Sequence, residues 1–121
     1  MLVEDEEALR KLVMNVLQNK GYTVIAPENV AEALKMLQKH MGPIHLLLTD
    51  VVMPVLSGRE LAERVTSLHK ETKVIYMSGY TNDAIVQHGV LDPGLNFVQK
   101  PFSPDTIARK VREVLDQPLI S

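Results

Sequence analysis

Apolar residues are distributed along this chain in two alternating patterns, short uninterrupted runs and longer stretches in which they recur every three or four positions. The uninterrupted runs occupy residues 1–3, 22–26, 44–49, 73–77 and 96–99. Runs of this length without polar alternation are typical of strands that are covered on both faces, as in a parallel sheet. Five strands are therefore predicted.

The stretches between these runs have the spacing of amphipathic helices. The residues predicted to face the core are Leu9, Leu12, Val13, Val16 and Leu17, then Val30, Ala33, Leu34 and Leu37, then Leu61, Ala62, Val65 and Leu68, and finally Ile107, Ala108, Val111, Val114 and Leu115. Gly21 is placed to end the first helix, and Ser57 and Ser103 to cap the third and the last. A further short helix is expected to begin at Thr81 or Asn82.

Five repeats of strand and helix with no linker between them predict one α/β domain spanning residues 1–121. Alternation of this kind favours a parallel sheet with helices on both faces. The commonest solution with five strands is the flavodoxin-like doubly wound sandwich, with strand order 2-1-3-4-5. We therefore expect a (βα)5 three-layer structure.

Composition and charge exclude several classes of function. The chain has no cysteine and a formal net charge of −2, so neither disulfides nor thiolate metal sites are available and no basic surface for nucleic acid is expected. The apolar runs are shorter than the roughly 20 residues that a membrane-spanning helix needs. A cytoplasmic domain with no nucleic-acid partner and no membrane contact of its own is the resulting expectation.

A carboxylate ends the most apolar run, "HLLLTDVVMP", at Asp50. Ligands of open α/β sheets bind beyond the carboxyl ends of the strands, where the strand order reverses. The first and third predicted strands flank that point, so Glu4 and Asp5 would meet Asp50 there. Three carboxylates in one crevice resist ionisation, and a magnesium ion, which prefers oxygen ligands, would relieve the repulsion. Singly, the acidic pair could favour a helix dipole and Asp50 could start a turn, but the joint placement favours a site.

Two more polar residues follow neighbouring strands at the same edge. Ser78 follows the fourth strand, in "MSGY", and Lys100 follows the fifth, in "QKPF". Alone, the serine could belong to a turn and the lysine to a solvated surface. Together with the carboxylates they form the set that a phosphoryl group on Asp50 would need, with a cation and an ammonium for its charge and a hydroxyl for one oxygen.

The segments "VEDE", "LLLTDVVMP", "YMSGY" and "QKPF" resemble, in this order, the receiver domain of two-component response regulators, over essentially the whole chain. The sequences of the segments "MSGYT", "LDPG" and "QKPF" are most similar to those of receivers attached to hybrid sensor histidine kinases. Since the first strand has only three residues before Glu4, we expect that the domain could be excised from such a longer kinase. By itself it would not be a classical enzyme, since it would only phosphorylate and dephosphorylate itself with magnesium.

The resemblance implies a role for each matching residue. Asp50 would accept a phosphoryl group in two-component or phosphorelay signal transduction. Asp5 would bind Mg²⁺ directly, Glu4 through water, and Val52 through its backbone carbonyl. Ser78 would be the switch hydroxyl. The phosphodonor would be a phosphohistidine on a sensor histidine kinase or a histidine phosphotransfer protein.

The resemblance also implies how the signal leaves the site. Phe97 would repack when Ser78 moves, although its spacing fits a plain core aromatic equally well. Pro54 would shape the loop beside the phosphoacceptor, and the Lys100–Pro101 peptide bond would be cis. The surface formed by the fourth helix, fifth strand and fifth helix would carry the message, and it could also serve a homodimer.

Other functions remain as alternatives. A receiver-like interaction module that is never phosphorylated would share the fold. A phosphatase with an aspartate nucleophile needs a second aspartate two residues later as its acid, where this chain has Val52. A nucleotide-binding protein of this fold needs a glycine-rich or hydroxyl-rich loop after the first strand, where this chain has the acidic "EDEEA".

Overall fold

A parallel sheet with helices on both sides forms the fold in the computed structural model, which describes residues 1–39, 42–51, 56–79 and 96–117. The strands are β1 (Leu2–Val3), β2 (Leu46–Asp50), β3 (Lys73–Ser78) and β4 (Asn96–Gln99). The helices are α1 (Glu7–Asn19), α2 (Val30–Lys39), α3 (Gly58–Leu68) and α5 (Pro104–Leu115). None of the helices among these residues is long and apolar enough to span a membrane.

The strands are parallel and lie in the order β1-β2-β3-β4, with Leu48 of β2 between Leu2 and Ile75. These are the first, third, fourth and fifth predicted strands, in the predicted order. The prediction for residues 22–26 was wrong, because this segment forms no strand. The backbone N–H of Leu2 donates to the carbonyl of Ile25 at 2.8 Å, so the segment contacts β1 without pairing with it as a strand. The helix expected after Thr81 falls outside the described residues.

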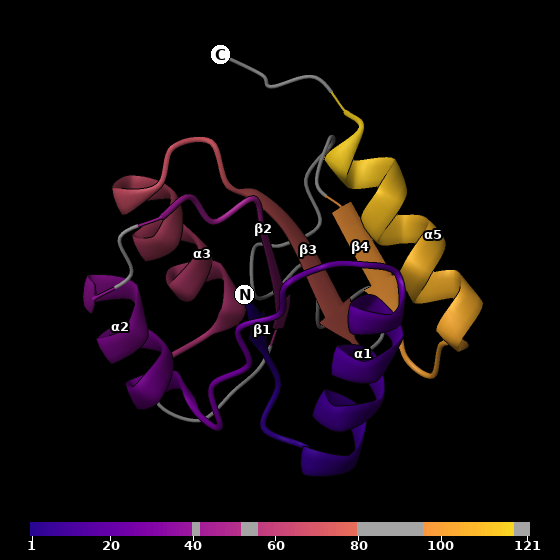
Figure 1. Cartoon of the computed structure of the whole chain (residues 1–121). Coiled ribbons are helices and arrows are strands. Elements are labelled where there is room, and N and C mark those ends of the chain that lie inside the picture. The colour runs from indigo at the N-terminus through magenta and orange to yellow at the C-terminus, as the bar shows by residue number, and fades with distance from the viewer. Residues whose placement is uncertain (40–41, 52–55, 80–95, 118–121) are drawn as a thin grey trace.

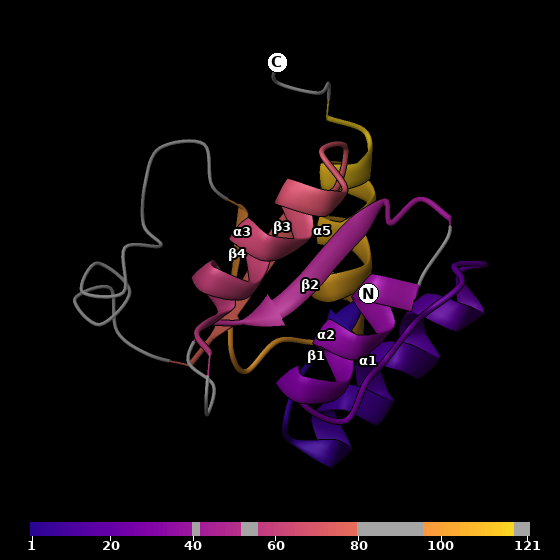
Figure 2. The same cartoon turned by 90° about the vertical axis from the view of Figure 1, so that its left-hand side faces the viewer.

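In the described part of the chain, α1 and α5 cover one face of the sheet and α2 and α3 cover the other (Figures 1 and 2). Neighbouring residues of β2 serve different cores, because Leu47 packs with the α2 and α3 side and Leu48 with the α1 and α5 side. This is why the strand is apolar without alternation. The polar groups of the sheet are left to the ends of its strands.

The helix ends follow the predicted chemistry. Ser57 Oγ accepts the N–H of Glu60, and Ser103 Oγ accepts the N–H of Thr106, each at 3.2 Å. Gly21, which follows α1, has a φ of 93°, in the left-handed region that favours glycine.

Two of the predicted core positions are exposed instead, Leu12 at 42% and Leu68 at 62%. The buried stripe of α1 centres on Val13 and Leu17, and Leu12 lies about 100° round the helix from Val13 and about 140° from Leu17. Leu68, the last residue of α3, lines an open groove between α2 and α3 and therefore borders solvent.

The N-terminal amine is buried at the opposite end of the sheet from the polar strand ends. It donates to the Leu46 carbonyl at 2.7 Å and lies beside a mainly apolar cavity of about 480 Å³, which Met1 helps to line. Burial lowers the pKa of this amine from 8.0 to about 6. Between pH 8 and pH 6 the unfolded chain therefore binds a proton that the folded chain excludes, and folding loses stability as the pH falls through this range.

For a polypeptide made with Met1 as its first residue, we predict that N-terminal acetylation, which removes the charge of the amine, stabilises the domain at pH 6 but not at pH 9. Because the amine pKa shifts from 8.0 to about 6 on folding, acetylation should raise the free energy of unfolding by about 2 kcal/mol at pH 6 and by close to zero at pH 9. Urea unfolding of the acetylated and free chains at both pH values measures it. An equal change at the two pH values would contradict the prediction.

The start of α3 touches the end of β2. Gly58 donates its N–H to the Val51 carbonyl at 2.8 Å, and a Cβ added to this glycine would lie 1.9 Å from the backbone carbonyl oxygen of Asp50. No other residue fits there unless the helix and the strand separate.

We predict that Gly58→Ala destabilises the domain by about 1–3 kcal/mol through this clash, although alanine is the better helix former. Thermal or urea unfolding checks it. Ser67→Ala, at an exposed position of the same helix, is the matched control and should be neutral or slightly stabilising. A Gly58→Ala variant at least as stable as the wild type would show that no such close contact exists.

Candidate functional site

Three carboxylates from two strand ends meet at one edge of the sheet. Glu4 and Asp5 follow β1, and Asp50 is the last residue of β2. Glu4 is 1% exposed and Asp50 9%, while Asp5 is exposed. One carboxylate oxygen from each of the three lies within 4.8 Å of the others. The structure therefore brings together the acidic group that the sequence predicts.

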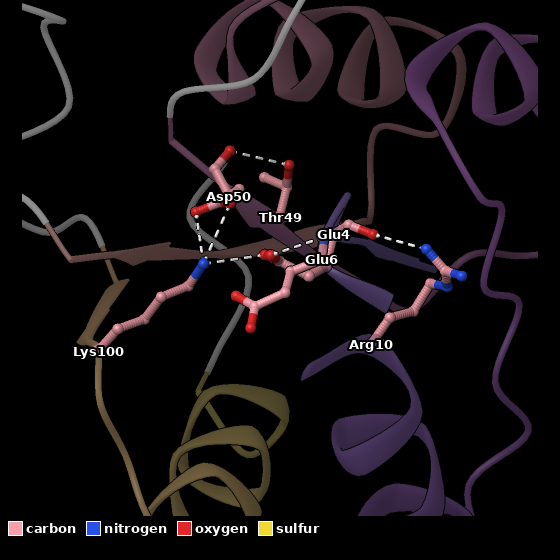
Figure 3. Close-up of polar contacts among 6 residues, drawn as sticks. All are labelled: Glu4, Glu6, Arg10, Thr49, Asp50 and Lys100. Carbon is pink, nitrogen blue, oxygen red and sulfur yellow. Dashed lines mark hydrogen bonds and ion pairs between the residues drawn. The ribbon is translucent and has the colours of Figure 1, made fainter. Parts of the chain in front are cut away.

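The ammonium of Lys100 lies between two of these carboxylates (Figure 3). Its Nζ is 3.0 Å from Glu4 Oε2 and 3.1 Å from either oxygen of Asp50. The Lys100 side chain is only 19% exposed. The lysine thus points into the acidic cluster rather than into solvent.

The turn after β4 holds Lys100 in this place. The backbone N–H of Lys100 donates to the carbonyl of Ser78 at 2.8 Å, which ties the turn to the end of β3. The Lys100–Pro101 peptide bond is cis, as the sequence resemblance implies.

Ser78 and Phe97 lie on the two strands beyond Asp50. Ser78 is fully buried at the end of β3, one residue past Met77, which pairs with Asp50. Phe97 pairs with Tyr76, is half-buried and packs against the core on the α2 and α3 side. The serine is thus close to the acidic edge, and the aromatic ring contacts the core. Val52 and Pro54, the other predicted site residues, lie outside the described part of the chain.

Burial and crowding perturb the acids and bases of the cluster. Burial and the neighbouring Asp50 raise the pKa of Glu4 from 4.5 to about 7, against the opposing effect of Lys100. Burial tends to lower the pKa of Lys100, but its hydrogen bonds and attraction to Glu4 and Asp50 outweigh this, and the net pKa is raised. The cluster therefore retains a proton on Glu4 near neutral pH unless a further cation compensates it.

The donor set fits magnesium. Mg²⁺ binds oxygen at about 2.0–2.1 Å in octahedral geometry, so neighbouring ligand oxygens are about 2.9 Å apart and opposite ones about 4.2 Å apart. The three carboxylate oxygens, all within 4.8 Å of one another, would have to draw closer together to surround one ion. Because Asp5 is exposed, the site is open to the waters that magnesium usually keeps.

Sequence reasoning missed the residues that support the cluster from outside. Thr49 Oγ1 donates to the Asp50 carbonyl at 3.1 Å, and Arg10 donates from its guanidinium to the Glu4 carbonyl at 3.1 Å (Figure 3). The sequence gives a weak indication of the Arg10 contact. Arg10 follows Glu6 by four residues, which is about one helical turn, so its side chain is expected near the turn that precedes α1. The sequence gives no indication of the Thr49 contact.

Comparisons with known proteins agree with this geometry. Residues 1–112 match the response regulator receiver domain family. The sensor kinase CckA of Brucella abortus is 36% identical over 117 residues, which are 97% of this chain and 12% of the kinase. The response regulator receiver protein CpdR of the same organism is 30% identical over 115 residues, covering 95% of this chain and 94% of CpdR.

A solved structure shows the same fold. The crystal structure of the receiver domain from the hybrid histidine kinase CckA is 30% identical, covers 95% of this chain and 96% of that one, and superimposes with a TM-score of 0.79. The family match spans nearly the whole chain, and the strand ends that it includes carry the acidic cluster and its lysine. The chain therefore belongs to the response regulator receiver domain family of two-component signalling.

Proposed function

We propose that this domain takes a phosphoryl group onto Asp50 from a phosphohistidine of a sensor histidine kinase or a histidine phosphotransfer protein. The observation that carries the proposal is the Lys100 ammonium, 3.0 Å from Glu4 and 3.1 Å from Asp50 in a buried acidic cluster. In this place the lysine brings its positive charge directly to the carboxylate of Asp50, which a lysine at a surface position would not do. A group that must neutralise a transferred anion needs to be here.

In the proposed reaction a carboxylate oxygen of Asp50 attacks phosphorus in line with the histidine nitrogen. The P–O bond forms as the P–N bond breaks, and the imidazole leaves with the electron pair of that bond. Phosphoryl transfer needs mostly position and charge neutralisation from the protein. Lys100 supplies one positive charge to the phosphoryl oxygens, and the hydroxyl of Ser78 would donate to one of them.

Magnesium completes the proposed charge balance. Glu4, Asp5 and Asp50, with the backbone carbonyl of Val52, would hold the ion, which supplies positive charge to the phosphoryl oxygens when bound. The fit of the three carboxylates supports this ligand set.

The proposed output is a change of surface. Phosphorylation would draw Ser78 toward the phosphoryl group and let Phe97 repack inward, which biases a two-state equilibrium. The face that would report the change is formed by the predicted fourth helix, β4 and α5, and it would serve a partner or a homodimer. We also propose a cytoplasmic location and, from the likeness to the CckA receiver, an origin in a hybrid kinase.

A receiver-like module that is never phosphorylated is the second candidate. The direct contacts of Lys100 with both carboxylates favour the phosphoacceptor instead. A phosphatase is disfavoured because Val52 stands where its acid would be.

We predict that acetyl phosphate or phosphoramidate adds one phosphoryl group to the wild type in the presence of Mg²⁺, and none to Asp50→Asn. Intact mass measurement detects the added group, and EDTA should abolish it. Asp105→Asn, at an exposed position of α5, is the matched control and should react like the wild type. Equal labelling of Asp50→Asn would move the phosphoacceptor elsewhere, and no labelling of the wild type would favour the interaction module.

We predict that Mg²⁺ binds more tightly as the pH rises from 6 to 8, because Glu4, with its pKa raised to about 7, must lose its proton first. Below that pKa the affinity should change by up to about tenfold per pH unit. Without metal, the same raised pKa makes the folded state lose stability as the pH rises from about 4.5 to about 7, because over this range it keeps a proton that the unfolded chain has already released.

Calorimetric titration with Mg²⁺ at several pH values measures how the metal affinity depends on pH. Glu4→Gln should flatten it, whereas Glu28→Gln, an exposed control, should leave it unchanged. If Glu4→Gln keeps the full pH dependence, another group controls binding.

A further inference from the structure

Arg10 holds the acidic turn from the side opposite Lys100 (Figure 3). It lies near the start of α1, and its guanidinium donates to the backbone carbonyl of Glu4 at 3.1 Å. The backbone N–H of Arg10 donates to the carbonyl of Glu6 at 2.9 Å. The N–H of Glu6 in turn donates to the carboxylate of Glu4 at 3.2 Å. Arg10 thus binds both ends of the three-residue turn from Glu4 to Glu6.

Asp5 is the residue whose position depends most on this turn. Glu4 and Asp50 are buried and both contact Lys100, so their carboxylates are fixed by packing and by the lysine. Asp5 is exposed, so packing does little to hold it, and its direction follows from the backbone of its two neighbours. A group that fixes that backbone therefore fixes the carboxylate.

We propose that Arg10 is a positioning residue of the metal site, whose bond to the Glu4 carbonyl holds the turn so that Asp5 faces the cation shared with Glu4 and Asp50. The proposal rests on the proposed function, since it assumes that this cluster binds magnesium. Arg10 touches neither the ion nor the phosphoryl group in this scheme. It acts through the main chain, as residues behind metal ligands commonly do.

Electrostatics alone predicts the opposite effect for a change at this position. A guanidinium near an acidic cluster repels a divalent cation, so its removal would strengthen cation binding. Loss of a positioning contact would weaken binding. Arginine and lysine also differ here, because the planar fork of arginine is pre-organised for the carbonyl, whereas lysine keeps the charge on a flexible stem. The two explanations therefore differ in whether loss of Arg10 strengthens or weakens Mg²⁺ binding. They differ again in Arg10→Lys, which keeps the charge but loses the planar guanidinium.

The test is calorimetric titration of the whole chain with Mg²⁺, in the absence of any phosphodonor. Arg10→Lys and Arg10→Gln should both bind Mg²⁺ about tenfold more weakly than the wild type. The matched control is Lys11→Gln, the next residue of α1, which is exposed and pairs with Glu7 at 2.9 Å. This variant should stay within about twofold of the wild type.

A double-mutant cycle tests whether the effect passes through Asp5. If Arg10 acts by positioning that carboxylate, Arg10→Gln should change the affinity little once Asp5→Asn is present. Hydrogen exchange of the Glu6 amide in the metal-free chain adds a readout of the turn itself, and it should be faster in both Arg10 variants. Thermal unfolding without metal shows whether each variant is folded. If Arg10→Gln is unfolded, the Mg²⁺ affinity of Arg10→Lys alone tests the proposal.

Each outcome decides between explanations. Unchanged binding in both Arg10 variants, or tighter binding in Arg10→Gln with none of the loss in Arg10→Lys, would overturn the positioning role while leaving magnesium binding and the proposed function intact. Full additivity with Asp5→Asn would overturn the route through Asp5. No Mg²⁺ binding by the wild type would overturn the proposed metal site and, with it, this role of Arg10.

Discussion

The contact of one ammonium with two buried carboxylates constrains the whole edge of the sheet. Glu4 and Lys100 are 96 positions apart in the sequence, yet their charged atoms are 3.0 Å apart. Removal of one partner from such a buried set leaves an uncompensated charge, which typically costs about 3–5 kcal/mol. The strand ends must therefore stay in register with one another, and burial together with Asp50 raises the pKa of Glu4 in spite of the lysine.

The parallel sheet makes this convergence possible. Its strands all end at one edge, so side chains that are remote in sequence meet there, while the apolar runs of β2 and β3 are buried between two pairs of helices. The helices thus keep water away from the strands and leave only the ends polar. The fold places the charges of the cluster where they are partly dehydrated but still reachable through the exposed Asp5.

Hydrophobic periodicity predicted the architecture well where packing is two-sided and regular. The strand at residues 96–99, the caps at Ser57 and Ser103 and the meeting of the acidic residues with Lys100 were all readable from pattern and spacing. The lack of a strand at 22–26 was not readable, because β-branched residues favour an extended chain but do not decide whether it pairs with a neighbour. Gly58 escaped prediction because its contact arises from close tertiary approach to a backbone carbonyl, which no periodicity encodes. Arg10 escaped prediction because its guanidinium binds a main-chain carbonyl six residues earlier, and periodicity places side chains on a face without naming such a partner.

The contact between Gly58 and the main chain of Asp50 has a mechanical consequence. With no side chain between helix and strand, there is no rotamer that could absorb a displacement at this point, and dense packing transmits strain. The end of β2 and the first turn of α3 must therefore move as one rigid piece. A displacement of the backbone at residue 50 would therefore be passed directly to the start of α3, on the side of the sheet away from α5.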